Sequence, residues 1–400
     1  MSRTSSVAGK LITRPLTLAC AAAVLIAGGT WVATHQQLQL VSSCASGYVS
    51  PGGHCGPFVP LPQGNLFTRR HISGGHSISV GVAGHDGVPA SAIAVLINVA
   101  ARTGQHDALL RVYPYGHSRP GFPSLNVPAH ATRSNVVELP PGRGGRVSFY
   151  ASSSVTASAS VMGYVSSSSV RGGLFVPRRS RRIATKNHVT HHLFTVHVLG
   201  RGGVPSSGVR AVVLNLTVSG KPTTVTAYPN GGRRPRHPDL YLSSSQATDT
   251  RQVVVKVGSG GKVAVFTSGG PDSIAVDVHG FFTGTTSGSG AQFHTLRAAT
   301  LRTVTVPAHG TVVVAVAGHR GVPSGSTAAV LNFTDKAVRG TYLTVYPNGS
   351  ARPGIADIYA PKGLSQSDFD IAQLGSNGKV SIHSSRGRVR VTIGVEGYYK

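Results

Sequence analysis

Apolar and polar residues alternate in short runs along most of this chain. In residues 389–396, Val or Ile occupies every second position, and Arg, Thr, Gly and Glu occupy the positions between them. Ile274, Val276 and Val278 alternate in the same way. Period-2 alternation bounded by Gly, Pro and Asn predicts antiparallel strands with one face in water. No helical period of useful length follows residue 35, so the pattern predicts an all-β fold.

One motif, Y-P-x-G-x-x-R-P, closes an apolar run at three places in the chain. It occupies residues 113–120, 228–235 and 346–353. Proline cannot donate to a β-ladder, so each strand should stop there. Tyr-Pro-x-Gly fits a type I turn with Pro at its second position. The motif therefore predicts a strand, a turn and an extended return in each copy.

Other landmarks recur with the motif at a constant spacing. Asn98, Asn215 and Asn332 lie in apolar runs 117 residues apart, and the pairs Gly163-Tyr164, Gly280-Phe281 and Gly397-Tyr398 keep the same spacing. A period this long indicates three tandem copies, each large enough for its own core. We expect three β-sandwich-like modules, called repeats 1, 2 and 3, at 64–165, 174–284 and 292–400. Ser- and Gly-rich linkers at 166–173 and 284–291 would separate them.

The order G-V-P, A-V-L-x-N-x-T, V-Y-P-N-G-x-x-R-P, G-K-V and G-Y-Y resembles a tandem repeat of secreted actinobacterial cell-surface proteins. Such repeats often accompany wall-directed domains, and the resemblance therefore implies a cell-wall or cell-surface location. The chain departs from that family in several places; for example, the Asp usually present in the last strand survives only as Asp277.

The first 63 residues have a different composition. Residues 1–14 are basic and residues 16–32 are uncharged and mostly apolar, which is typical of an export signal. Residues 1–35 would be a cleaved signal peptide or a retained membrane anchor; both readings fit. Residues 36–63 form a Gly/Ser/Pro-rich spacer with Cys44 and Cys55. Since an exported chain meets an oxidising space, we expect these cysteines to pair.

The charge balance is strongly basic, with 38 Lys and Arg against 12 Asp and Glu. Repeats 1, 2 and 3 carry +5, +10 and +7. Such an excess favours anionic cell-wall polymer or a membrane surface as partner. A solvated basic surface without a dedicated partner is the plainer reading. Nucleic acid is disfavoured, because the chain is exported and shows no stacking-aromatic motif.

The candidate binding residues are all arginines. Arg119, Arg234 and Arg352 hold the same motif position, where each would brace its turn through carbonyls or face a ligand. Arg178, Arg179, Arg181 and Arg182 form the densest basic cluster, expected on a loop. We expect binding to concentrate on repeat 2, which contains this cluster.

Catalytic and metal motifs are lacking. The chain has no G-x-S-x-G elbow and no H-E-x-x-H, and its few acids make a glycosidase-type pair improbable. His188, His191, His192 and His197 are dense, but no Cys or acid accompanies them. We therefore expect neither an enzyme nor a cofactor. The leading hypothesis is an exported, non-enzymatic cell-envelope protein; the alternative is an accessory carbohydrate-binding or adhesion module set that docks a partner protein.

Overall fold

The computed structural model describes residues 54–168, 171–189, 193–243 and 248–400. All of them belong to one compact unit, Ser43–Lys400. Strands dominate, and the helical elements described are two short 3-10 turns, η1 (Arg143–Gly145) and η2 (Ser259–Gly261). The predicted all-β fold is confirmed. Within the described ranges no helix is long and apolar enough to cross a membrane, and the expected export segment 1–35 lies outside them.

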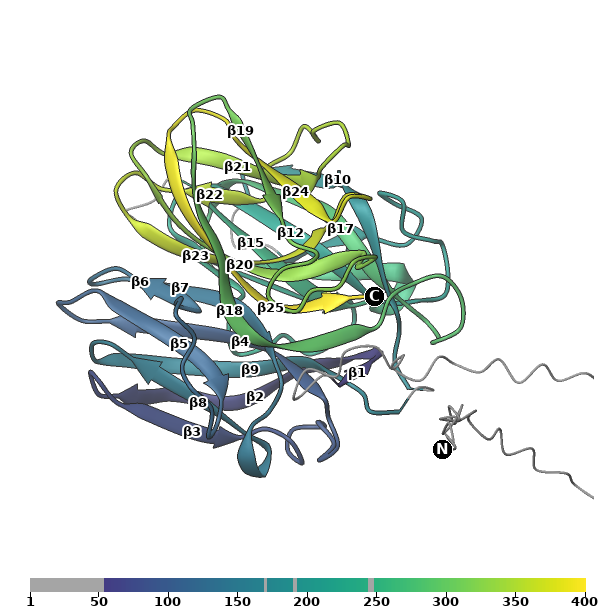
Figure 1. Cartoon of the computed structure of the whole chain (residues 1–400), viewed down its shortest axis with the longest axis horizontal. Coiled ribbons are helices and arrows are strands. Elements are labelled where there is room, and N and C mark those ends of the chain that lie inside the picture. Colours follow the sequence, from purple (N-terminus) through teal and green to yellow (C-terminus); the bar gives the residue numbers. More distant parts are fainter. Residues whose placement is uncertain (1–53, 169–170, 190–192, 244–247) are drawn as a thin grey trace, which may run out of the picture. The chain divides into compact units, whose positions relative to one another are not determined.

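Each repeat folds into eight strands, whose bounds follow in chain order (Figure 1). Repeat 1 contains β2 (Phe58–Ile72), β3 (Ser77–Gly81), β4 (Ala94–Thr103), β5 (Ala108–Pro114), β6 (Leu125–Val127), β7 (Thr132–Leu139), β8 (Arg146–Ala151) and β9 (Val155–Val165). Repeat 2 contains β10 (Phe175–Asn187), β11 (Leu193–His197), β12 (Val209–Gly220), β13 (Thr223–Pro229), β14 (Leu240–Leu242), β15 (Thr248–Lys256), β16 (Lys262–Thr267) and β17 (Pro271–Thr283). Repeat 3 contains β18 (Phe293–Val306), β19 (Thr311–Ala315), β20 (Ala328–Ala337), β21 (Thr341–Pro347), β22 (Ile358–Ala360), β23 (Ser365–Gln373), β24 (Lys379–Ser384) and β25 (Val389–Tyr399).

The strands of each repeat divide between two antiparallel sheets with one topology. The inner sheets have the orders β2-β9-β4-β7, β10-β17-β12-β15 and β1-β18-β25-β20-β23, where β1 is the short strand Cys55–Gly56. The outer sheets have the orders β3-β8-β5-β6, β11-β16-β13-β14 and β19-β24-β21-β22. In repeat 1, Val95 and Ile97 of the inner sheet share a core with Leu110 and Phe149 of the outer sheet. This shared core confirms the β-sandwich character.

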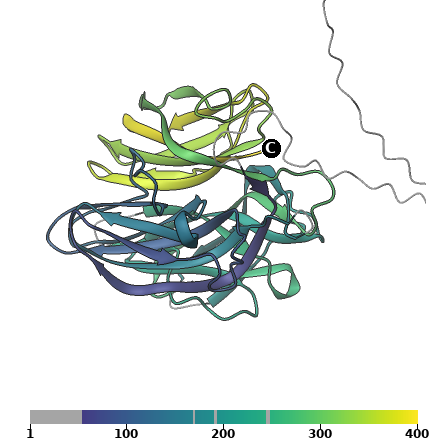
Figure 2. The ribbon, with the colours of Figure 1, turned by 60° about the horizontal axis from the view of Figure 1, so that its bottom comes forward.

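The arrangement of the six sheets differs from the expected string of three modules. They are the blades of a propeller-like arrangement inside one compact unit, and the views in Figures 1 and 2 show the three strand groups packed together. Additionally, β2 begins at Phe58, ahead of the expected start of repeat 1 at residue 64. Part of the predicted spacer 36–63 therefore belongs to the fold.

Inner-sheet strands are buried on both faces. Along β4, Val95 and Ile97 face the core of repeat 1, whereas Ala94 and Leu96 join a central cluster with residues of the other two repeats. The expectation of one wet face is therefore wrong for these strands and holds for outer strands such as β5. A strand covered on both sides reads as a continuous apolar run instead of an alternating one.

Backbone pairing joins the three repeats in a cycle. Phe58 pairs with Gly173, and Phe175 pairs with Ala291. The short strand β1 (Cys55–Gly56) completes the pattern, because Gly56 pairs with Phe293 of repeat 3. Each repeat is thus hydrogen-bonded to the segment that introduces the next one, and the segment before repeat 1 closes the cycle.

An aromatic cluster fills the centre beside these pairings. Phe58 lies 4.5 Å from Phe282 between ring centroids, Phe175 lies 4.7 Å from Tyr399, and Phe293 lies 5.4 Å from Tyr399. All five rings are buried. Apolar burial of this size stabilises the contact between repeats by several kcal/mol, at about 25 cal/mol per Å².

Candidate functional site

Two of the three motif arginines lie over rings of the adjoining outer strand. The guanidinium of Arg119 is 4.0 Å from the ring centroid of Tyr150, and that of Arg234 is 3.8 Å from Phe266. In repeat 3, His383 holds the position of Tyr150 and Phe266, and Arg352 is close enough to act on it electrostatically. The pKa of His383 is lowered, first by burial and then by the charge of Arg352. A cation over an aromatic face is attracted by the ring quadrupole. All three arginines remain exposed.

The turns themselves are held by a different side chain. In each repeat a residue after the motif accepts a hydrogen bond from the backbone N–H that precedes Tyr-Pro. The three pairs are Ser124 with Val112 at 3.0 Å, Asp239 with Ala227 at 2.7 Å, and Asp357 with Val345 at 2.5 Å. Arg119 and Arg234 therefore lie over aromatic rings, and a brace of the turn through carbonyls stays a prediction.

The basic cluster of repeat 2 lies on strand β10, so the expected loop position is wrong. Arg182 forms an ion pair with the buried Asp277, at 2.5 Å and 3.2 Å. Arg178 donates to the carbonyl of Gly203 at 3.0 Å. Arg179 and Arg181 are exposed. Register shifts beside Arg181 and Arg182 break the pairing with β17 and let consecutive basic side chains reach the surface.

The asparagines of the inner sheets bond to the next repeat. Asn98 donates to the carbonyl of Pro238 at 3.0 Å, and Asn215 donates to that of Ala356 at 2.9 Å. These two asparagines therefore satisfy loop backbone groups of the neighbouring repeat. Asn332 is buried, and neither of its side-chain polar atoms has a hydrogen-bond partner among the described residues.

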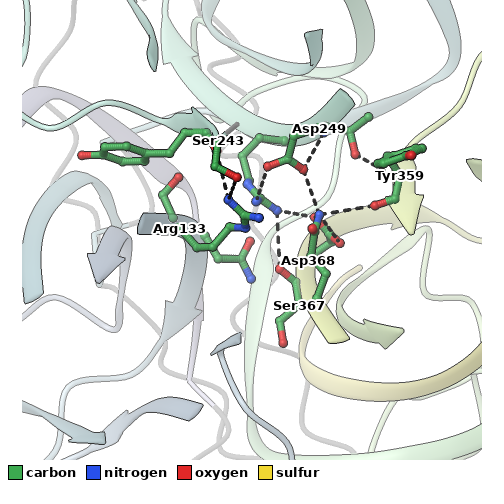
Figure 3. Close-up of polar contacts among 12 residues, drawn as sticks. Arg133, Ser243, Asp249, Tyr359, Ser367 and Asp368 are labelled. Atoms are coloured by element: carbon green, nitrogen blue, oxygen red, sulfur yellow. Dashed lines mark hydrogen bonds and ion pairs between the residues drawn. The ribbon is translucent and has the colours of Figure 1, made fainter. Parts of the chain in front are cut away.

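A polar network connects the three repeats (Figure 3). Arg251 pairs with Asp249 at 3.3 Å and with Asp368 of repeat 3. Gln366 donates to Asp249 at 2.8 Å. Arg133 of repeat 1 donates to Ser243 of repeat 2 at 3.2 Å. Arg133 and Arg251 are the only Lys or Arg of the described ranges that are buried, and both serve the contact between repeats.

Most acidic residues of the chain are buried. They are Glu138, Asp239, Asp249, Asp277, Asp335, Asp357, Asp368, Asp370 and Glu396. Burial raises the pKa of Glu138 and Glu396 to about 8, and that of Asp239, Asp368 and Asp370 to about 7. Asp86, Asp107 and Asp272 are exposed. The acids thus neutralise far less of the surface than the composition suggests.

This burial changes the comparison between repeats. All five acids of repeat 3 are buried, whereas its Lys and Arg lie at the surface. Arg386, Arg388 and Arg390 form a further exposed cluster at the start of β25. At the surface repeat 3 is therefore as basic as repeat 2. The signal for this equality was available in the sequence, since the acids of repeat 3 stand inside apolar strand runs.

A cleft of about 120 Å³ lies between repeats 2 and 3. Arg178, Arg179 and Ser180 of β10 line one side, and the motif turn of repeat 3 lines another. His279 lies in its wall, with Nδ1 3.4 Å from the Ser180 hydroxyl and Nε2 3.3 Å from Oδ1 of Asp357. Burial lowers the pKa of His279 to about 4. Sequence reasoning missed His279, because no motif surrounds it.

These three side chains do not form a serine-hydrolase relay. His279 Nε2 and Asp357 Oδ1 lie 3.3 Å apart, yet neither atom has a hydrogen-bond partner among the described residues. Activation of a serine needs aligned hydrogen bonds from nucleophile to base and from base to acid.

The predicted disulfide and the histidine cluster lie partly outside the described residues. Cys55 is buried in β1, and Cys44 lies outside the described residues, so their disulfide stays a prediction. His191 and His192 also lie outside them. The described part of the chain holds no group of three or more His, Cys, Asp or Glu suited to a metal ion.

Comparisons with known proteins add little. No family model matches the chain, and no curated protein matches it. A solved structure described as the triple jelly roll fold and turret assembly in an archaeal virus aligns at 9% identity, covers 86% of this chain and 90% of that one, and has a TM-score of 0.17. One from Sulfolobus Turreted Icosahedral Virus aligns at 11% identity, covers 86% and 91%, and has the same TM-score. Likeness at this level carries no argument about fold or function.

Proposed function

We propose that this protein is an exported, non-enzymatic component of the cell envelope that binds or coats anionic wall polymer. The observation that supports the proposal is the separation of charge in the fold. Nine of the twelve acids are buried, and every described Lys or Arg except Arg133 and Arg251 lies at least partly at the surface. A surface of one sign attracts flexible polymers of the opposite sign and releases their counterions.

The charged surface is spread over two repeats. Arg179 and Arg181 project from β10, and the cluster Arg386, Arg388 and Arg390 projects near β25. Several separated clusters suit a long polyanion better than a small ligand, because the polymer contacts many of them at once.

The test is co-sedimentation of the full chain with a glycerol phosphate teichoic polymer over a range of salt concentrations. We expect affinity to fall at least about 100-fold from low to high salt, since binding to a linear polyanion releases counterions. The double variant Arg179→Ser/Arg181→Ser and the variant that changes Arg386, Arg388 and Arg390 to Ser should each weaken binding. Retention that is indifferent to salt would sink the proposal.

A further inference from the structure

The cleft between repeats 2 and 3 combines a basic rim with a polar, buried wall. Arg178 and Arg179 stand at the rim, and neither is within ion-pair distance of a carboxylate in the described ranges. Arg178 is held in place, because its guanidinium lies 5.1 Å from the ring centroid of Phe281 and donates to the carbonyl of Gly203. A fixed guanidinium suits a phosphate, which it can bind through two parallel hydrogen bonds.

The wall has hydrogen-bonding capacity that the protein leaves unused. His279 is 6% exposed, and its Nε2 has no hydrogen-bond partner among the described residues. Oδ1 of Asp357, 3.3 Å from this Nε2 atom, also has no hydrogen-bond partner among the described residues. Asp370, also buried, lines the cleft. Because a buried polar atom without a hydrogen bond is unfavourable, such a group calls for a partner that the ligand can supply.

The corresponding place at the other two contacts is built differently. Between repeats 1 and 2, Gln63 occupies the position of Ser180 and donates to Asp239 at 3.3 Å, while Met162 occupies the position of His279. Between repeats 3 and 1, the His279 position is Glu396. The combination of paired arginines and His279 at a contact is therefore particular to repeats 2 and 3.

The size of the cleft limits what it can hold. Its volume is about 120 Å³. That space suits a three-carbon polyol with its phosphate at the rim.

We propose that this cleft binds a single glycerol phosphate unit, with the phosphate on Arg178 and Arg179 and a glycerol hydroxyl on His279. The inference rests on the proposed function, since such units repeat along an anionic wall polymer. A phosphatidylglycerol headgroup presents the same chemistry, so the experiment distinguishes these two sources.

The test is calorimetric titration of the full chain with glycerol 3-phosphate, inorganic phosphate and glycerol. Glycerol 3-phosphate should bind at least about tenfold more tightly than inorganic phosphate, because it also uses His279. His279→Met should remove that preference. Since Met already stands at this position in repeat 1, the variant should keep its fold, which circular dichroism checks.

Arginine variants test the other half of the site. Arg178→Ser/Arg179→Ser should weaken both phosphate compounds at least about tenfold. The control, Arg233→Ser on the exposed turn of repeat 2, should leave both affinities unchanged. Equal affinity for glycerol 3-phosphate and inorganic phosphate in the unmodified protein, or unchanged affinity in the double variant, overturns the site.

Competition identifies the source and separates this inference from the proposed function. Glycerol 3-phosphate should displace the protein either from the teichoic polymer or from phosphatidylglycerol vesicles, and either displacement supports the site. Displacement from neither contradicts it. The protein could still sediment with the polymer in a salt-sensitive way while it binds no glycerol 3-phosphate. That result would refute the cleft site alone and would leave the proposed function unaffected.

Discussion

Repeats 2 and 3 meet through charged and amide side chains, whereas repeats 3 and 1 meet through an aromatic ring and protonatable carboxyls. At the first contact, Arg251 bonds to Asp368, and Gln252 bonds to Asp370. At the second, Phe122 covers Gly394 so closely that a Cβ there would lie 2.4 Å from the ring.

The same backbone pattern thus carries two kinds of chemistry. The second contact also includes Glu138, which accepts a hydrogen bond from Tyr399 at 3.2 Å. The ring of Phe122 fills its space, while the polar contact leaves a cleft. The comparison indicates that the inner sheets fix how the repeats meet, and that a few side chains outside the repeated landmarks decide what each contact can bind.

Removing Arg251 should have the largest effect on this comparison. Arg251→Ala leaves Asp249 and Asp368 buried without their cation, and we expect a loss of about 3–5 kcal/mol in the free energy of unfolding. Lys256→Ala, at the exposed end of the same strand, is the matched control and should change little. Chemical denaturation measures both. A loss below about 1 kcal/mol for Arg251→Ala would mean that the charged network does not hold the repeats together.

The carboxyls of the second contact predict a pH dependence. Burial raises the pKa of Glu138 and Glu396 from the ordinary value near 4.5 to about 8. The folded state therefore keeps protons that the unfolded chain loses. The stability they contribute is fully present below about pH 4.5 and is lost as pH rises through about 8.

Glu138→Gln isolates this effect from other titrating groups such as His279. Relative to the unmodified protein, the variant should gain on the order of 3–4 kcal/mol in stability between pH 5 and pH 8, because one pKa unit corresponds to about 1.4 kcal/mol and the shift spans most of this window. Denaturation midpoints at several pH values give the difference. Parallel pH profiles for the two proteins would contradict the burial of an uncharged carboxyl at this contact.

The asparagines offer a subtler comparison of the same two contacts. Asn215→Leu should destabilise the protein by about 1–2 kcal/mol, because it leaves the carbonyl of Ala356 without its bond. Asn332→Leu removes polar atoms that have no hydrogen-bond partner in the described ranges, so it should be neutral or stabilising by up to about 1 kcal/mol. Thermal unfolding measures the stability of both variants. Equal losses of stability would show that the two asparagines do not differ in their contribution.

The smallest expected effect concerns the motif arginines. Arg234→Ala removes a cation from the face of Phe266 and should cost about 0.5–1 kcal/mol. Arg352→Ala should cost less, because its neighbour His383 has a pKa lowered partly by that same charge. A double-mutant cycle between Arg234 and Phe266 measures the coupling, and a value near zero would show that the contact contributes nothing to stability.

The repeated landmarks allowed the sequence to predict the strands and the two-sheet character of each repeat. The Tyr-Pro ends of β5, β13 and β21 follow directly from the inability of proline to continue a ladder. The run Ala94–Ala101 did not alternate, and that could have revealed an inner sheet covered on both faces.

What lies between the repeats could not be predicted from their periodicity. The position shared by Met162, His279 and Glu396 differs in each copy, and only the packed structure shows that it faces a neighbouring repeat. Likewise, the ring beneath each motif arginine belongs to a distant strand. Its recurrence as Tyr150, Phe266 and His383 was the available signal.

The pairing of Gly56 with Phe293 limits how the gene can be rearranged. The three backbone pairings between repeats, which we call seams, close the cycle. A fourth inserted copy would therefore have no unpaired strand edge to pair with. Cys55 and Tyr399 both pair with β18, on opposite sides of it. A short linker from Lys400 to Cys55 would therefore permit a circular permutant that begins at Gly173, with every seam retained in a new chain order.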